Sequence, residues 1–267
     1  MKLLSRLKKS PAEAQVAISN ERGIRYLHFG PEAIQGAMRI SRPHALELEY
    51  TQDMMAALLF NPSPQRISIL GLGAGSIAKF CLVHLPDAKI ACAELSHAVV
   101  SVARQWFEVP QDDARFRVVV DDAGYWIKAE EARCDYLLVD LYDAAAKGPV
   151  LASSAFYTDC RQALERGTAK GRTGVMAVNL FGQHNSYRTN IANITAVFEG
   201  KVCVLPASAR GNVVVLAFVG DDPAESAAEL EPTLTPNLTV RAAQLQASTG
   251  LAYPRYLRDW QNRAARA

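Results

Sequence analysis

Apolar positions along this chain fall into two patterns that alternate from residue 66 onward. Short continuous apolar runs, typical of buried strands, are followed by stretches in which apolar residues recur every three or four positions, as on one face of a helix. The first pattern predicts strands at 66–70, 88–93, 116–120, 134–140 and 173–180, and the second predicts helices at 76–84, 96–107, 123–131, 154–165 and 187–199. Strands that alternate with helices predict an α/β fold, in which helices cover a parallel sheet.

The last two predicted strands break this alternation. They cover Lys201–Leu205 and Asn212–Val219, and the short turn between them is too short for a helical crossover, so we expect the two strands to pair antiparallel. A parallel sheet that ends in an antiparallel hairpin is the Rossmann-like, methyltransferase-type arrangement. Beyond it, 221–237 has the prolines and acidic residues of a surface loop, and terminal helices are predicted at 238–248 and 254–265.

The N-terminal segment has a different pattern. Val16–Ile18 and Ile24–Phe29 flank a polar turn, as in a β-hairpin. A helix is predicted from 45 to 60, where a turn with two prolines stops it. We therefore divide the chain into an N-terminal tail with a small β-hairpin element, 1–44, and a Rossmann-like domain, 45–267.

Composition narrows the class of protein. With 267 residues, of which 49% are hydrophobic, the chain can bury one large core or two unequal ones, and its net charge of +2 without a dense basic patch gives no case for a nucleic-acid partner. No apolar stretch reaches membrane-spanning length, so no membrane partner is expected. The five cysteines are scattered without a C-x-x-C pair, which predicts buried, reduced thiols and a cytoplasmic protein. The five histidines lack metal-ligand spacing, so no metal is expected.

The most informative chemical signal is the glycine-rich turn in the run RISILGLGAGS. Gly71, Gly73 and Gly75 remove side chains, so the backbone can turn tightly against a ligand, and Ser76 can cap the helix that follows. Glu94 ends the next strand, where a carboxylate can accept hydrogen bonds from ribose hydroxyls. The pair favours a site for a nucleotide-like cofactor over a plain strand-to-helix turn.

More acids follow the next two strands, at the edge where such a sheet presents ligands. Asp121 and Asp122 can accept a hydrogen bond from an adenine amino group or cap the next helix, and Asp122 can do both. Asp140 and Asp143, in the run VDLYDA, can hold a cationic amine or form an Asx turn.

The chain resembles the polyamine aminopropyltransferases, typified by spermidine synthase, from about Gly23 to Phe218. The residues that carry the resemblance are IQ at Ile34–Gln35, NPSPQRISILGLGAG at Asn61–Gly75, Glu94, DDA at Asp121–Ala123, VDLYDA at Val139–Ala144 and GPVLASSAFYTDCRQAL at Gly148–Leu164. The resemblance implies that the large domain binds an S-adenosyl ligand. It also implies the reaction, in which an aminopropyl group moves from decarboxylated S-adenosylmethionine, as co-substrate, to a small-molecule diamine such as putrescine, and methylthioadenosine is released.

The resemblance also implies residue roles. Gln35 corresponds to a substrate-side glutamine, and Asp140 to the residue that accepts the proton of the attacking amine or orients it. Asp143 corresponds to a partner for an amine. Tyr50 resembles a tyrosine that assists this step, although it can equally be an aromatic residue packed between the two domains. A homodimer is a possible assembly.

One position departs from the family, since its glycine loop carries an aspartate where this chain has Ala74. That acid attracts the amine tail of the decarboxylated donor, so either another acid, such as Asp140, holds the tail or the donor differs. Two alternatives follow. The chain can be an S-adenosylmethionine-dependent methyltransferase, which Ala74 and Asn179 favour, or a non-catalytic homologue that binds polyamines or nucleosides.

Overall fold

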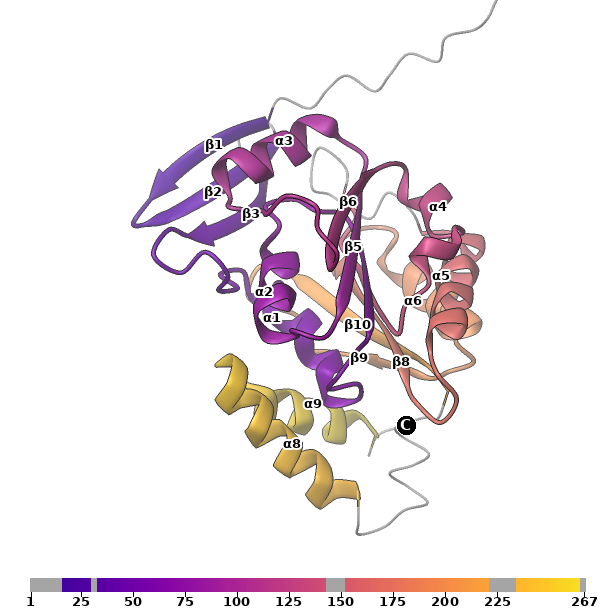
Figure 1. Cartoon of the computed structure of the whole chain (residues 1–267). Helices are drawn as coiled ribbons and strands as arrows, with labels where there is room; N and C mark the ends of the chain where they lie inside the picture. The colour runs from indigo at the N-terminus through magenta and orange to yellow at the C-terminus, as the bar shows by residue number, and fades with distance from the viewer. Residues whose placement is uncertain (1–15, 30–32, 143–151, 221–233, 265–267) are drawn as a thin grey trace, which may run out of the picture.

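A seven-stranded sheet forms the centre of the computed structural model, which describes residues 16–29, 33–142, 152–220 and 234–264 (Figure 1). The strands lie in the order β6-β5-β4-β7-β8-β10-β9. The strands β4 to β8 are parallel to one another, and β10 runs antiparallel to both β8 and β9. Their bounds are β4 Arg66–Leu70, β5 Lys89–Glu94, β6 Phe116–Val120, β7 Tyr136–Val139, β8 Gly174–Phe181, β9 Val202–Val204 and β10 Asn212–Val219. This confirms the predicted α/β sheet with its terminal antiparallel hairpin.

Helices cover both faces of this sheet. The helices α2 Ser76–His84 and α3 His97–Trp106 pack on one face, and α4 Ala123–Trp126, α5 Ser154–Gly167 and α6 Tyr187–Val197 pack on the other (Figure 1). Each face has its own buried cluster because side chains alternate along a strand, so Ile67 and Ile69 of β4 point to one cluster and Leu70 to the other.

Two predicted helices are shorter than expected. Within 123–131, α4 ends at Trp126, and a 3₁₀ turn, η2 Glu130–Ala132, follows after Ala129, whose backbone is extended. Within 45–60, α1 covers only Glu49–Met54 and passes into a second 3₁₀ segment, η1 Met55–Leu59. All five residues of η1 are buried, so this segment has no polar face and no amphipathic period that would favour an α-helix.

The N-terminal segment forms a small antiparallel sheet of three strands, where the pattern predicted two. The predicted hairpin is present as β1 Val16–Glu21 and β2 Ile24–Phe29, joined by Arg22 and Gly23, which both have positive φ as a two-residue hairpin turn requires. The unpredicted third strand, β3 Ala33–Arg39, pairs with β2. It matters for function because it carries Gln35.

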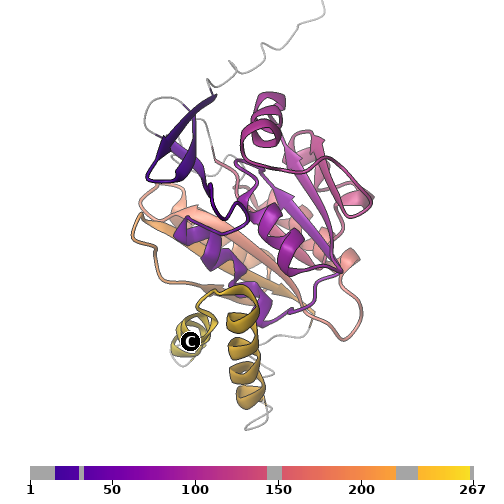
Figure 2. The ribbon, with the colours of Figure 1, turned by 60° about the vertical axis from the view of Figure 1, so that its left-hand side comes forward.

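The terminal helices α8 Leu234–Thr249 and α9 Tyr253–Ala264 lie beside α1 and η1 (Figures 1 and 2). The Tyr253 hydroxyl donates to the Met55 carbonyl at 3.2 Å, and Trp260 packs edge-on against Phe60 with ring centroids 5.4 Å apart. These helices therefore pack against the segment formed by α1 and η1, and α1 carries Tyr50.

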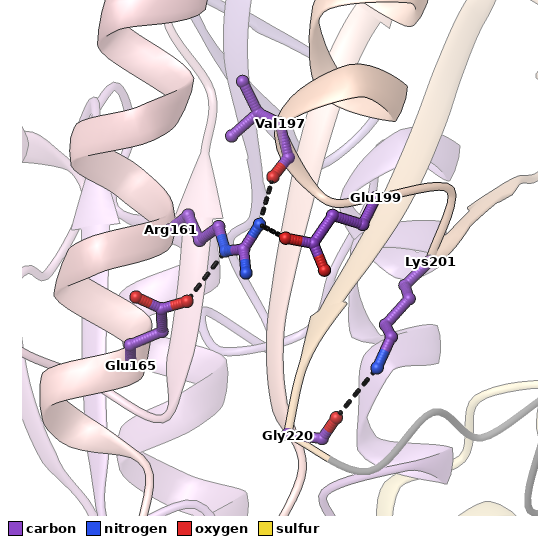
Figure 3. Close-up of polar contacts among 6 residues, drawn as sticks. All are labelled: Arg161, Glu165, Val197, Glu199, Lys201 and Gly220. Carbon is purple, nitrogen blue, oxygen red and sulfur yellow. Dashed lines mark hydrogen bonds and ion pairs between the residues drawn. The ribbon is translucent and has the colours of Figure 1, made fainter.

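On the face of the sheet that α4, α5 and α6 cover, Arg161 connects α5 to the end of α6 (Figure 3). Arg161 of α5 donates to Glu165 of its own helix, and also to the Val197 carbonyl and the Glu199 carboxylate at the end of α6. Its three contacts fix the turn that leads from α6 into β9, close to where Lys201 donates to the Gly220 carbonyl.

Within the part of the chain that the structure describes, no helix has the length and apolarity needed to cross a membrane.

Candidate active site

A cavity of about 410 Å³ lies at the carboxyl ends of the central strands, and its walls come from both sheets. Residues that follow β4, β5 and β7 form one side, and residues of β3, α1 and the loop before β10 form the other. The carboxyl ends of parallel strands are where α/β sheets place their ligands, because loops and helix N-termini converge there.

The glycine turn after β4 lies in close contact with the backbone that follows β7. Gly71 and Gly73 line the cavity and have φ values of +92° and +51°. A Cβ on Gly71 would lie 2.3 Å from the carbonyl oxygen of Asp140, so only glycine lets β7 approach the turn this closely. Gly75 lies outside the cavity lining and has a left-handed backbone at the start of α2, where a Cβ would meet Val109 at 2.2 Å.

Ser76 does not cap α2, contrary to the sequence prediction. Gly75 occupies the N-cap position and no side chain caps it. The Ser76 hydroxyl instead donates to the Ala37 carbonyl of β3 at 2.9 Å, because the small sheet lies directly against the start of the helix. The hydroxyl therefore connects the glycine turn to the strand that carries Gln35.

Glu94 lines the cavity at the end of β5, as its position in the sequence predicts. One carboxylate oxygen accepts from the Leu72 amide at 3.0 Å and the other from the Ser96 amide at 2.9 Å. A carboxylate has about four acceptor positions, so Glu94 can hold the glycine turn and still accept hydrogen bonds from a diol.

The two acids after β6 have different positions. Asp122 lines the cavity and also caps α4, since its carboxylate accepts from the Gly124 amide at 2.7 Å. Asp121 lies outside the cavity lining, and its side chain accepts from the Asp122 amide. Of this pair, the structure brings only Asp122 to the candidate site.

Asp140 lines the cavity, and two donors hold its carboxylate. The Tyr50 hydroxyl donates to Oδ2 at 3.0 Å, and the Asn179 amide donates to Oδ1 at 2.9 Å. Burial raises the pKa of Asp140, and the two hydrogen bonds lower it in part. Burial and the neighbouring Asp140 carboxylate raise the pKa of Tyr50, so the phenol keeps its proton and acts as a donor.

The side chains of Asn212 and Tyr142 extend this group, and sequence reasoning assigned a role to neither. The Asn212 side-chain amide donates to the side-chain oxygen Oδ1 of Asn179 at 3.1 Å and to the Tyr142 hydroxyl at 3.5 Å. The sequence pattern associated Asn179 with methyl transfer, whereas here it orients a carboxylate. The available signal was one asparagine in each of two apolar strands, Asn179 within β8 and Asn212 at the start of β10. That signal does not reveal that β8 and β10 pair antiparallel.

Gln35 lines the cavity from β3, and its side-chain nitrogen is buried without a hydrogen-bond partner in the described residues. A buried donor without a partner is costly unless a ligand accepts from it, so this amide fits a substrate contact. Asp143 lies outside the described residues.

Two acids of the same wall were not predicted. Glu49 lines the cavity. One of its oxygens accepts from the Ala209 amide at 2.9 Å, and the other lies 3.8 Å from the Arg255 guanidinium. Glu47 also lines the cavity, but both of its oxygens accept from Arg39, at 2.7 and 2.6 Å, so its charge is already paired.

Residues 47–217 match the family model described as the spermine/spermidine synthase domain. The chain belongs to this family. A polyamine aminopropyltransferase of Chromobacterium violaceum is 34% identical over 248 residues, 92% of this chain and 89% of the relative. One from Neisseria meningitidis serogroup B is 33% identical over 244 residues, 91% of this chain and 88% of the relative. Membership in the spermine/spermidine synthase family makes the chain a transferase of aminopropyl groups.

Solved structures of a spermidine synthase and of a methyltransferase-like protein share the fold. A probable spermidine synthase of Corynebacterium glutamicum has a TM-score of 0.62 at 20% identity, covering 85% of this chain and 83% of its own. Human methyltransferase-like protein 13, solved with SAH, has a TM-score of 0.57 at 23% identity and covers 79% of this chain and 93% of its own. That likeness shows the fold alone. Because the family model and the two curated relatives support aminopropyl transfer, the methyltransferase and non-catalytic alternatives are not favoured.

Ala74 stands in the glycine turn where the resemblance led us to expect an aspartate, and the structure shows what Ala74 contacts. Ala74 is buried in a small apolar cluster with Leu27, Met38 and Phe107, and it lies outside the lining of the large cavity. A Cβ on Gly36 of β3 would lie 2.5 Å from the Ala74 side chain, so the small sheet packs closely over this position. In this member of the spermine/spermidine synthase family, the acids available to a cationic ligand therefore lie elsewhere in the cavity.

Proposed function

We propose that the chain transfers the aminopropyl group of decarboxylated S-adenosylmethionine to a diamine such as putrescine and releases methylthioadenosine. The observation that supports this most directly is the buried Asp140 carboxylate, held between Tyr50 and Asn179 in the cavity that the glycine turn and Glu94 also line. A solved spermidine synthase with a TM-score of 0.56 was crystallised with the transition-state analogue AdoDATO.

The nucleoside of the donor fits the end of the cavity formed by the glycine turn. Glu94 would accept hydrogen bonds from the two ribose hydroxyls, and Asp122 would accept from the adenine amino group. Gly71 and Gly73 leave space for the chain that links ribose to sulfur. Gln35 would donate its unpartnered amide to the substrate.

Proton transfer is the chemical problem that Asp140 would solve. A primary amine attacks only when it is neutral, yet an alkylamine is almost fully protonated near pH 7. Asp140 would bind the ammonium and then accept its proton, and its raised pKa makes it a stronger base than an exposed carboxylate. The hydrogen bonds from Tyr50 and Asn179 keep it in one orientation while it does so.

The substitution itself needs no group beyond these. The neutral nitrogen forms a bond to the aminopropyl carbon next to sulfur, the carbon–sulfur bond breaks, and its electron pair returns to the sulfonium. The positive charge thus passes from sulfur to nitrogen, which leaves as a dialkylammonium, and Asp140 releases to solvent the proton that it accepted before the attack. Preorganised acids near the developing ammonium stabilise this transfer of charge.

Carboxylates along the acceptor side provide a second charge for a diamine. Glu49 lines the cavity next to Tyr50. Its hydrogen bond from Ala209 and its 3.8 Å ion pair with Arg255 use only part of its acceptor capacity. Asp143 remains proposed as an amine partner from its place in the VDLYDA run alone.

The decisive experiment offers the protein decarboxylated and intact S-adenosylmethionine in parallel, each with a panel of diamines, and identifies products by mass spectrometry. We expect methylthioadenosine and an aminopropylated diamine from the decarboxylated donor only. Methylation of an acceptor with the intact donor, and no transfer from the decarboxylated one, would show that the proposed donor is wrong.

A further inference from the structure

A second cavity, of about 290 Å³, lies at the edge of the large sheet opposite the active site. The active site is built where β4, β5 and β7 end, whereas this cavity is lined by residues that begin β4, β5 and β6. We call it the basic cavity, because its lining contains five cationic side chains and two acids: Arg66, Lys89, Arg115, Arg117 and Arg133, with Asp113 and Glu131.

The strand register places three of these cations on one face of the sheet. Arg66 lies opposite Lys89 across β4 and β5, and Arg117 lies opposite Ala91 across β5 and β6. Since side chains alternate faces along a strand, Lys89 and Ala91 share a face, and so the three cations point to the same side. Neighbouring strands are about 4.8 Å apart, so three like charges are held side by side.

This face is open where the cations lie. Further along the strands, Ala91 and Val119 pack against the buried cluster beneath α4 and α5. At the strand starts the covering layer ends, so Arg66 and Lys89 are exposed and Arg117 is half-buried.

The three cations have no counter-charge of their own. Arg133 forms an ion pair with Glu130, and the Arg115 guanidinium donates to the carbonyls of Leu82, Leu85 and Ala88. The Asp113 carboxylate is engaged by two backbone amides, which lower its pKa. Over the ranges that the structure describes, the side chains of Arg66, Lys89 and Arg117 have neither a hydrogen bond nor an ion pair, and Glu131 is the one lining acid without a partner.

We propose that the basic cavity binds an anion with two or more adjacent phosphate groups, as in inorganic triphosphate or the phosphate tail of a nucleotide. Each of the three unpaired cations can then take a separate phosphate oxygen, and the guanidinium groups can do so with two nitrogens. A single phosphate carries about 1.5 to 2 negative charges, too few to balance three cations. Binding would also relieve the repulsion among them.

Calorimetric titration at low ionic strength tests this, with inorganic triphosphate as the probe, orthophosphate as the single-phosphate arm and uridine triphosphate as the nucleotide arm. The test variant is Lys89→Gln with Arg117→Gln. Its matched control, Lys170→Gln with Arg188→Gln, removes the same charge from exposed residues that do not line the basic cavity. Unfolding temperatures without ligand check the fold, and the test variant should be at least as stable as the original chain, because two repelling charges are gone.

We expect triphosphate to bind the original chain and the control alike, and to bind the test variant about tenfold or more weakly, as for the loss of charge-assisted hydrogen bonds. The tighter of triphosphate and uridine triphosphate identifies the source of the phosphates, and either result supports the site. The proposal is overturned if the original chain does not bind triphosphate, if the control loses as much affinity as the test variant, or if orthophosphate binds as tightly as triphosphate.

Discussion

At the scale of single residues, the chemistry depends on Asp140 and the two donors that hold it. Asp140→Asn keeps the size of the side chain but removes its ability to accept a proton. We expect turnover to fall by about 100-fold or more, the usual scale for loss of a general base, while methylthioadenosine binds as before. Steady-state kinetics and calorimetry measure the two effects. Full turnover in a folded Asp140→Asn variant would exclude the proton-accepting role.

Tyr50 adjusts the same carboxylate through one hydrogen bond, which favours the charged form of Asp140 and lowers its pKa. Tyr50→Phe removes that bond, so the pKa of Asp140 should rise. Because the base acts when deprotonated, the acidic limb of the kcat profile should then move to higher pH. A lower kcat with an unmoved limb would mean that Tyr50 only packs against its neighbours.

At the scale of elements, the glycine turn determines how closely β4 and β7 meet. Gly71→Ala places a Cβ 2.3 Å from the Asp140 carbonyl, at a φ of +92°, and should destabilise the fold by about 2 kcal/mol or more while displacing Asp140. Gly73→Ala is the matched control, since its Cβ would have 3.2 Å to the nearest atom, the Gln35 carbonyl oxygen. Denaturant unfolding and turnover should both separate the two variants, and equal losses would contradict this account of the turn.

The contact between α1 and α9 predicts a dependence of stability on pH. Asp53 is buried beside Arg255, and burial raises its pKa to about 6, above its ordinary value, because desolvation outweighs the ion pair. The folded state therefore holds this proton more tightly than the unfolded state. The free energy of unfolding should fall as pH rises from about 4 to 6, by up to about 3 kcal/mol from this group, and the deficit persists above pH 6.

Asp53→Asn should remove that part of the pH dependence, whereas Asp87→Asn, at an exposed position, should leave it in place. Urea unfolding of the three proteins at pH 4.5 and 7.5 measures the difference. An Asp53→Asn protein with the original pH dependence would contradict the assignment.

At the scale of the whole molecule, the terminal helices close the core on the side of η1. Trp260 of α9 is 6% exposed and packs against Phe60, which in turn contacts Phe218 of β10. Trp260→Ala should therefore cost about 3 to 5 kcal/mol in denaturant unfolding. Trp106→Ala, where the ring is 44% exposed, should cost about 1 kcal/mol or less, and similar losses at the two positions would show that α9 is not part of the core.

The sequence by itself determined those elements whose bounds depend only on residues close to them in the chain. The predicted bounds of β4, α2, β6 and β10 agree with the structure to the residue, because each apolar run meets a turn residue or a charged residue at its ends. The glycine turn and Glu94 were also identified locally, from one strand, one turn and the strand that follows. The 3₁₀ segment η1 was not identified, because a segment buried on all sides shows no alternation of apolar and polar positions.

Only the tertiary structure decided which distant residues meet. Tyr50 and Asp140 are 90 positions apart, and Asn179 reaches Asp140 from a strand that periodicity describes only as buried. The cations of the basic cavity are scattered along the chain, and the strand order β6-β5-β4 with its register places them on one face. Periodicity reports which side of an element faces the core, but not which element lies next to it, and both cavities are formed between elements.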